Sequence, residues 1–440
     1  MTSNPKHTSP SNNKSSLAGT PNLIRQIISS DITRKISETF LTKILLMIIG
    51  LVTSVIITRN LGPEGRGIFA MTVIIGAIGV QIGNLGLHGS NTFYVAKNPD
   101  TLPSLLGNSM LISIVLGSLL VGFAALFFFF YPELAPAQGS LLYLGLVWIP
   151  PGLAYLLIQN LLLGIQEFHT FNKIELFSKI VFLLLVGLII FFNISSVTTI
   201  FTGSLIALAL SLAWSLRMIY PFLAHRISLS YSMFKRSIHY GIKSYLGSIF
   251  AFLLLKIDLL MVNEILGKEE AGWYDISVIL AEMIYVLPMV VFTILFPKLC
   301  AMENIQNKWQ LTKNVGAILM VAMGIISVLI WFLANHIIEI LYGEAFLAAA
   351  SVFILLVLGK SVICMSQVFG NFVASINVPW TAIPFGFFLV LINIQLNLIF
   401  IEHYGMIGAA LASIICFSLL IPFNFYYCAK YLRHQTSPDS

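Results

Sequence analysis

Long apolar segments recur along the whole chain, and each is about long enough to cross a membrane as a helix. Such a helix needs about 20 mostly apolar residues to span about 30 Å of hydrocarbon, and it satisfies its own backbone polar groups. Charged residues, Pro and Gly divide the sequence at about this spacing. The pattern predicts an all-α polytopic membrane protein with twelve transmembrane helices, at residues 40–59, 67–90, 105–130, 140–163, 173–193, 198–219, 240–263, 273–297, 314–334, 347–375, 380–401 and 405–429.

Composition excludes a soluble domain. Of the 440 residues, 58% are hydrophobic and 10% are charged, whereas an ordinary soluble domain is about 25% charged. The four cysteines show no CxxC or Cys/His ligand spacing, so we expect no zinc site, no disulfide framework and no cofactor. The sequence contains no GxxxxGKS or GxxxxGKT motif, so we expect no direct use of ATP.

The basic residues predict the orientation, because Lys and Arg stay on the cytoplasmic side of short loops. With the N-terminus inside, eighteen of the 24 Lys and Arg are cytoplasmic, and only Arg59, Arg66 and Lys268 are external. We therefore expect both termini in the cytoplasm and the protein in the cytoplasmic (inner) membrane. The net charge of +6 gathers at membrane edges, above all from Arg217 to Lys243, which indicates contact with anionic membrane lipids and no nucleic-acid partner.

A short motif occurs twice. Residues 61–69 read LGPEGRGIF, and residues 266–274, 205 positions later, read LGKEEAGWY. Each copy lies between the first and second helices of a six-helix half, and an even number of helices gives both halves the same orientation. This predicts a parallel repeat, with two lobes around a central cavity and a pseudo-two-fold axis along the membrane normal. The alternative is two unrelated tight loops that share Gly for the turn.

The repeat and the spans define an expected organisation. It comprises a polar, disordered cytoplasmic tail, a six-helix lobe, a basic cytoplasmic linker, a second six-helix lobe and a short cytoplasmic tail, at residues 1–39, 40–219, 220–239, 240–429 and 430–440.

Several stretches resemble one family. Residues 59–69 resemble the loop after the first helix in polysaccharide repeat-unit flippases, the O-antigen (Wzx-like) branch of the multidrug/oligosaccharidyl-lipid/polysaccharide exporter superfamily. Residues 257–274, 341–346 and 397–410 resemble later helices and loops of that family. The resemblance implies alternating-access transport of lipid-linked oligosaccharide on undecaprenyl diphosphate, for surface polysaccharide such as O-antigen. It also implies polysaccharide polymerase and chain-length machinery as partners.

Ionisable side chains inside the spans are the first candidate site residues, because each costs roughly 3 kcal/mol or more unless it faces a cavity or a partner. Lys256 and Asp258 point about 200° apart on the seventh span, so we expect one to face the central cavity and the other a neighbouring helix. Asp258 matches the pattern of the resembled family and is the candidate ion-coupling acid, with a structural hydrogen bond as the alternative. Glu282 is a second ion-coupling candidate, and Asp275, on the same face, is expected to be solvated.

A polar stripe follows Lys360 along the tenth span. Cys364, Gln367 and Asn371 lie four, seven and eleven residues after it. A stripe that contains a cation is expected to line an aqueous path and, together with Lys256, to hold an anionic group of the substrate. The alternative is hydrogen bonding to adjacent helices.

The second span has two predicted faces. Its glycine face, which permits close packing against another helix, comprises Gly76, Gly79, Gly83 and Gly86. Its polar face, which is expected to be wet, comprises Gln81, Asn84, His88 and Asn91. Asn84 and His88 are predicted substrate contacts, although a single His is more often structural.

Arg59 and Arg66 flank the first external loop. Guanidinium matches phosphate geometry, so both are candidate contacts for a lipid diphosphate. The alternative for an Arg at a helix end is an anchor in the membrane interface.

Three functions compete on these observations. The first is the lipid-linked oligosaccharide flippase. The second, an ion-coupled exporter of small molecules or drugs on the same fold, predicts a cavity dominated by acids. The third, a membrane-embedded glycosyltransferase or acyltransferase, predicts acidic, metal-binding or His motifs in sizeable loops, which this sequence lacks. We therefore expect a transporter and not an enzyme.

Overall fold

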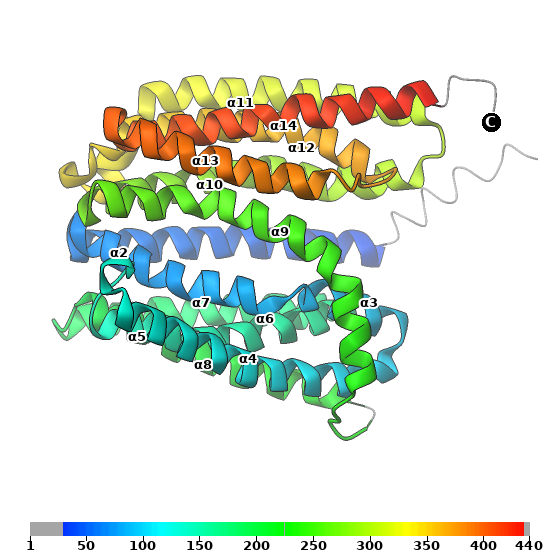
Figure 1. Cartoon of the computed structure of the whole chain (residues 1–440), viewed down its shortest axis with the longest axis horizontal. Coiled ribbons are helices and arrows are strands. Elements are labelled where there is room, and N and C mark those ends of the chain that lie inside the picture. The colour runs from blue at the N-terminus through cyan, green and yellow to red at the C-terminus, as the bar shows by residue number, and fades with distance from the viewer. Residues whose placement is uncertain (1–29, 224, 435–440) are drawn as a thin grey trace, which may run out of the picture.

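The computed structural model describes residues 30–223 and 225–434, and all the regular structure in these ranges is helical. Figure 1 shows the helices running along one common direction, with the second half of the chain stacked on the first. The first half contains α2 (Ser30–Asn84), α3 (Leu87–Lys97), α4 (Leu102–Phe130), α5 (Ser140–Val147), α6 (Ile149–Gly164), α7 (Phe168–Phe191) and α8 (Val197–Ile219). The second half contains α9 (Tyr231–Ile265), α10 (Lys268–Ala301), α11 (Ile305–Tyr342), α12 (Ala349–Ala374), α13 (Ala382–Tyr404) and α14 (Met406–His434). Four short 3-10 turns lie at residues 99–101, 132–134, 220–222 and 344–346.

The prediction of about twelve crossings in two six-helix lobes is confirmed. Among the described residues, 11 helices are long and apolar enough to cross a membrane, and the first of them, Leu41–Asn84, covers the first predicted span and most of the second. The chain turns inside it at Gly62 (φ 69°, ψ −179°), a conformation that is almost exclusive to Gly, and Pro63 follows. The repeat-equivalent Gly267 (φ 119°, ψ −177°) separates α9 from α10 in the same way.

One predicted span is wrong as a single helix, and another contains a local break. The second, 67–90, is interrupted because Leu85 and Gly86 have positive φ values of 47° and 77°, so α2 ends and α3 begins there. The fourth, 140–163, is confirmed as one span, Ser140–Gly164, although Trp148 separates its two helical segments α5 and α6 just before Pro150 and Pro151.

The predicted tail and linker boundaries also need correction. Helix α2 begins at Ser30, inside the predicted tail 1–39, and residues 1–29 lie outside the described part of the chain. Helix α9 begins at Tyr231, inside the predicted linker 220–239, and the Ser230 side chain caps it by accepting a hydrogen bond from the Met233 N–H (3.3 Å). Helix α14 continues to His434, beyond the predicted boundary at 429.

The predicted glycine face packs as expected. Cβ atoms added at Gly76 and Gly79 would collide with Trp148 and Ile149, and one added at Gly83 would lie tightly against Leu153, at 3.0 Å. Helix α2 therefore approaches α5 and α6 closely because these positions have no side chain. Gly86 has a different neighbour, the backbone of Gly241 in α9.

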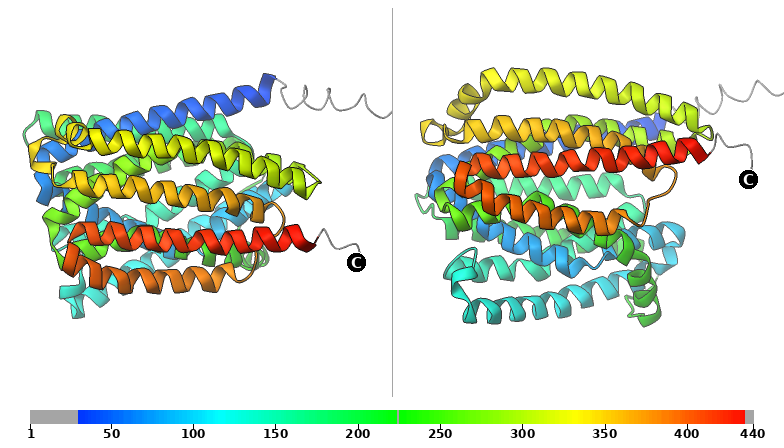
Figure 2. Two further views of the ribbon diagram at one scale, coloured as in Figure 1. Left: turned by 90° about the horizontal axis from the view of Figure 1, so that it is seen from above. Right: turned by 45° about the horizontal axis from the view of Figure 1, so that its top comes forward.

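The bundle has two ends, which we name by their residues. At the Gly62 end, α2 turns at Gly62 and α10 begins at Lys268; at the terminal end, α2 begins and α14 ends. Figure 2 shows from two further directions that the long helices connect these ends. Helix α9 first runs across the terminal end and then bends to follow the other helices (Figure 1).

Candidate functional site

The two copies of the repeat pack directly against each other, α2 on α10. A Cβ atom added at Gly67 would collide with the carbonyl oxygen of Lys268, and one added at Gly272 would collide with that of Pro63. Gly67 and Gly272 are repeat equivalents, and so are Pro63 and Lys268, which makes the contact reciprocal. A two-fold relation between the lobes requires such reciprocity, and this contact supports duplication over two unrelated loops.

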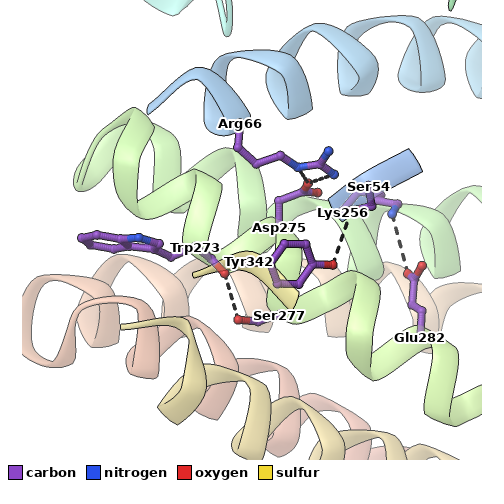
Figure 3. A network of polar contacts seen from close by, with 8 residues as sticks. All are labelled: Ser54, Arg66, Lys256, Trp273, Asp275, Ser277, Glu282 and Tyr342. Carbon is purple, nitrogen blue, oxygen red and sulfur yellow. Dashed lines mark hydrogen bonds and ion pairs between the residues drawn. The ribbon is translucent and has the colours of Figure 1, made fainter. Parts of the chain in front are cut away.

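A buried ion pair joins the lobes beside these glycines. The Arg66 guanidinium donates from Nε and Nη2 to Oδ2 of Asp275, at 2.8 and 2.5 Å, and only 6% and 14% of the two side chains is exposed. Figure 3 shows the two residues facing each other across the lobe boundary. The expectation that Asp275 is solvated is wrong, because α2 covers it. Arg66, a predicted substrate contact, is occupied by Asp275 in this conformation.

Two further contacts close the Gly62 end. Ser54 Oγ lies 3.4 Å from Tyr342 Oη (Figure 3). Arg59 donates to the carbonyl oxygens of Leu341 (2.8 Å) and Ile340 (2.5 Å) at the end of α11. The last carbonyls of a helix have no partner within it, so a guanidinium caps them well. Arg59, the second predicted arginine contact, binds protein here.

Lys256, Glu282 and Lys360 form a charged group, which we call the lysine cluster, on α9, α10 and α12. Lys256 Nζ lies 3.8 Å from Glu282 Oε1, and 32% and 46% of these side chains is exposed. Lys360 Nζ lies 5.5 Å from the centre of the Tyr285 ring and interacts electrostatically with both Glu282 and Lys256. The lysine cluster therefore combines two cations with one acid.

The lysine cluster lies deep in the bundle. At 1.5 Å per residue, its members are about 14 to 21 Å from the Gly62 end of their helices. The hydrocarbon core of a bilayer is about 30 Å thick, so the lysine cluster lies near the middle of the membrane. Lys256 and Glu282 are partly exposed at this depth and Lys360 is buried, and charges so deep in a membrane protein commonly mark a substrate or ion path.

Asp258 is on the other side of α9 and lies inside the second lobe. It accepts hydrogen bonds from Asn397 Nδ2 (2.7 Å), Tyr274 Oη (3.3 Å) and the Ser413 hydroxyl. All four side chains are buried. The opposite directions of Lys256 and Asp258 agree with their angular separation on the helix.

The group around Asp258 is rich in oxygen atoms and incompletely bonded. Asn397 Nδ2 also donates to Asn393 Oδ1 (3.1 Å), while Asn397 Oδ1 has no hydrogen-bond partner among the described residues. A buried polar atom without a partner costs about 1–3 kcal/mol. A carboxylate with amide and hydroxyl oxygens around it suits a proton or a hard cation such as Na⁺.

The predicted polar face of the second span is not a continuous wet surface. Asn84 is buried, and its side chain bonds the ring of His88 (2.6 Å) and accepts from the His88 backbone N–H (3.1 Å). Asn91 is buried and donates to Ser109 Oγ (2.9 Å). The prediction fails because the backbone turns at Leu85 and Gly86, which changes the directions of later residues.

The polar stripe on α12 is also divided. Lys360 belongs to the lysine cluster, whereas Cys364 is packed in an apolar cluster with Leu319 and Val368. Gln367 is exposed and lines a separate pocket between α9, α12, α13 and α14. Asn371 donates to the Gln367 backbone carbonyl of its own helix (2.8 Å).

Some residues of the site were not singled out from the sequence. These are Asp275 as the partner of Arg66, and Tyr274, Asn393 and Ser413 around Asp258. The spacing of four between Asn393 and Asn397 in an apolar segment was an available signal, because it places two amides on one helix face.

The fold defines the class: a polytopic membrane protein with two helical lobes, the architecture that solved transporters of the multidrug/oligosaccharidyl-lipid/polysaccharide (MOP) superfamily share. Residues 32–303, more than half of the chain, match the family model described as polysaccharide biosynthesis protein. The chain belongs to this family.

Individual relatives are distant. The probable low-salt glycan biosynthesis flippase Agl15 of Haloferax volcanii is 22% identical over 236 residues, which is 52% of this chain and 48% of that protein. The match thus spans about half the length of this curated relative.

Solved structures share the fold over most of the chain. The lipid II flippase MurJ in an inward closed conformation superposes with a TM-score of 0.70 and 17% identity, covering 88% of this chain and 86% of that one. A multidrug resistance MATE family transporter of the MOP superfamily, in an inward-facing conformation, superposes with a TM-score of 0.69 and 14% sequence identity. The superposition covers 90% of this chain and 96% of that one.

Proposed function

We propose that the protein is a flippase that moves lipid-diphosphate-linked oligosaccharide repeat units across the cytoplasmic membrane by alternating access. Membership of the polysaccharide biosynthesis family supports a glycan cargo. The two lobes touch at the Gly62 end, through Arg66 and Asp275, and nearer the terminal end, where Gly86 meets Gly241 and Tyr245 Oη donates to the Ile82 carbonyl. Alternating access would break and re-form these two sets of contacts in turn. The orientation predicted from the basic residues places the Gly62 end outside and both termini in the cytoplasm.

The lysine cluster is the main observation behind the proposal, because its charge favours an anionic cargo over a cationic one. Lys256 and Lys360 give two basic side chains for one acidic side chain, Glu282, at mid-membrane depth. A diphosphate is an anion and binds such a group by charge-assisted hydrogen bonds. The alternative, an exporter of cationic small molecules or drugs, requires the opposite balance of charge. We therefore propose Lys256 and Lys360 as contacts for the diphosphate, on undecaprenyl or a related lipid.

Asp258 is the proposed ion-coupling residue. Its carboxylate, the two amides and the Ser413 hydroxyl lie within the second lobe, away from the lysine cluster. Binding of a proton or Na⁺ there changes how α9, α13 and α14 are held together, and α9 also carries Lys256. Glu282, the other predicted coupling acid, lies beside the lysines, where it acts as their counter-ion.

Asp258→Asn is expected to remove the dependence of transport on an ion gradient. The substitution keeps the shape of the side chain but removes the charge that binds a cation. In vesicles with an imposed Na⁺ or proton gradient, the variant should transport at the rate that the wild type shows without a gradient. Glu282→Gln is the matched control and should retain the gradient response. A full response in Asp258→Asn would contradict the assignment.

The flippase proposal itself is tested in cells that lack the protein. Complete lipid-linked repeat units should accumulate on the cytoplasmic leaflet, and mass spectrometry with a leaflet-specific label would identify them. The intact gene should reverse the accumulation. Normal surface polysaccharide and no accumulation, in a strain without a second flippase, would favour the small-molecule exporter.

A further inference from the structure

A pocket inside the second lobe is separate from the lysine cluster. It has a volume of about 630 Å³, within the range of about 300–1,000 Å³ that is usual for ligand sites. Its wall follows α9 from Lys243 to Leu255, which is about 18 Å at 1.5 Å per residue. Lys243, Ser244 and Gln367 are its polar lining residues, and the rest of the lining is apolar or Gly. The pocket is therefore long, mostly apolar and charged at one end.

Small residues keep the pocket open. Ser244, Gly247 and Ala251 succeed one another at helical spacing along α9, and Gly386 on α13 also lines the pocket, where it contacts Phe250 of α9. A Cβ atom added at Gly247 would meet no atom within 4 Å. The pocket therefore exists because α9 has small residues at these positions, and larger side chains there would fill it.

The charged end of the pocket has the features of a membrane interface. Lys243 Nζ lies 4.5 Å from the centre of the Trp380 ring, and 65% of Trp380 is exposed. Tyr240, one turn earlier on α9, is exposed and stacks on Phe93 at 4.3 Å. Trp and Tyr gather where lipid headgroups lie. Within the part of the chain that the structure describes, Lys243 forms no ion pair, so its charge is available to a ligand.

We propose that this pocket binds one chain of an anionic phospholipid of the surrounding bilayer, with the phosphate against Lys243 and Trp380. Three observations agree. The apolar part runs from headgroup depth into the hydrocarbon, as a lipid chain does. The charge at the mouth is positive and has no ion-pair partner among the described residues, and the preceding stretch from Arg217 to Lys243 contains no acid. Basic pockets between transmembrane helices bind such headgroups. This inference goes beyond the proposed function and does not depend on the cargo.

Bound lipid would brace α9 where the two lobes also touch. Gly241, two residues before Lys243, packs its backbone against that of Gly86. A chain along α9 fills the space beside this contact.

The test is native mass spectrometry of the full-length, delipidated protein, titrated with phosphatidylglycerol or phosphatidylcholine of identical chains. The wild type should retain one phosphatidylglycerol at a concentration about fivefold lower than phosphatidylcholine. Lys243→Gln should remove this preference. Gly247→Leu and, independently, Ala251→Phe should abolish retention of either lipid, because each fills the pocket.

Two variants serve as matched controls. Lys313→Gln removes a lysine that also lies over a Trp ring, Trp309 at 5.9 Å, but lines no part of this pocket. Gly324→Leu adds the same side chain at another glycine with open space around it. Both should retain phosphatidylglycerol as the wild type does.

Three results would overturn the proposal. The first is that both pocket-filling variants elute as folded protein and still retain lipid. The second is that Lys243→Gln still prefers phosphatidylglycerol to phosphatidylcholine. The third is that a polyprenyl diphosphate displaces phosphatidylglycerol at an equal or lower concentration. The last result would assign the pocket to the lipid tail of the cargo instead.

Discussion

Replacing both Lys256 and Lys360 by glutamine is expected to abolish transport while the folded protein remains in the membrane. Hydrogen bonds to a charged group contribute about 1.5–3 kcal/mol each, and about 1.4 kcal/mol corresponds to a factor of ten. Each substitution should therefore reduce transport by roughly 10- to 100-fold. The double variant leaves Glu282 as the one charge of the lysine cluster, and a carboxylate repels a diphosphate.

The measurement is the rate at which a lipid-linked oligosaccharide becomes accessible on the opposite leaflet of vesicles with equal amounts of protein. Lys179→Gln is the matched control, because Lys179 also lies within a span, on α7, but is exposed on another helix. It should transport at the wild-type rate. Glu282→Gln should not weaken binding of an anionic cargo. Wild-type transport by the double variant would remove the lysine cluster from the cargo path.

The number of helices and the two-lobe plan were predictable because both leave local signals. Hydropathy records directly whether a segment can lie in lipid, and the repeated motif marks the same turn in both halves. Helix ends were less predictable, as α9 shows. Its first turns carry Lys235 and Arg236, so hydropathy does not detect them, yet they are helical because a helix can continue beyond the hydrocarbon.

The sequence was sufficient to predict several residues of the candidate site, but not which residues they contact. The depth of Lys256, Asp258 and Lys360 follows from their positions in apolar segments. The contacts do not, because they join distant parts of the chain: Arg66 and Asp275 are 209 residues apart, and Asp258 and Asn397 are 139 apart. Only the packing of the lobes decides such pairs.

Asn84 and His88 show a different limit of the sequence. A helical wheel assumes a continuous helix, and the turn at Leu85 and Gly86 breaks it. A glycine that looks like one more packing residue, Gly86, is also the point where the backbone changes direction.

Gly67→Val is expected to hold the lobes apart at the Gly62 end and to stop transport. The added side chain meets the backbone carbonyl of Lys268, which cannot rotate away as a side chain could. Overpacking of this kind costs about 1–3 kcal/mol, and it acts only on the conformation in which α2 and α10 touch. The closed state should therefore become roughly 5- to 150-fold less populated relative to the open one.

The opening can be measured directly at Ser54, which is buried at the lobe contact beside Tyr342. In a background with the exposed Cys300 replaced, Ser54→Cys should react slowly with a water-soluble thiol reagent, and faster once Gly67→Val is added. Gly50→Val is the matched control on the same helix, because a Cβ there meets no atom within 4 Å. It should leave both reactivity and transport unchanged.

The reciprocal contact between Gly67 and Gly272 allows a stricter test of the two-fold relation than one variant alone. Gly272→Val places its side chain against Pro63 as Gly67→Val does against Lys268, so the two variants should have similar effects on transport and on the reactivity at position 54. Normal transport in either variant would mean that α2 and α10 need not touch during the cycle. If only one of the two variants impaired transport strongly, the lobes would not close about a two-fold axis, because a two-fold axis gives equivalent side chains equivalent contacts.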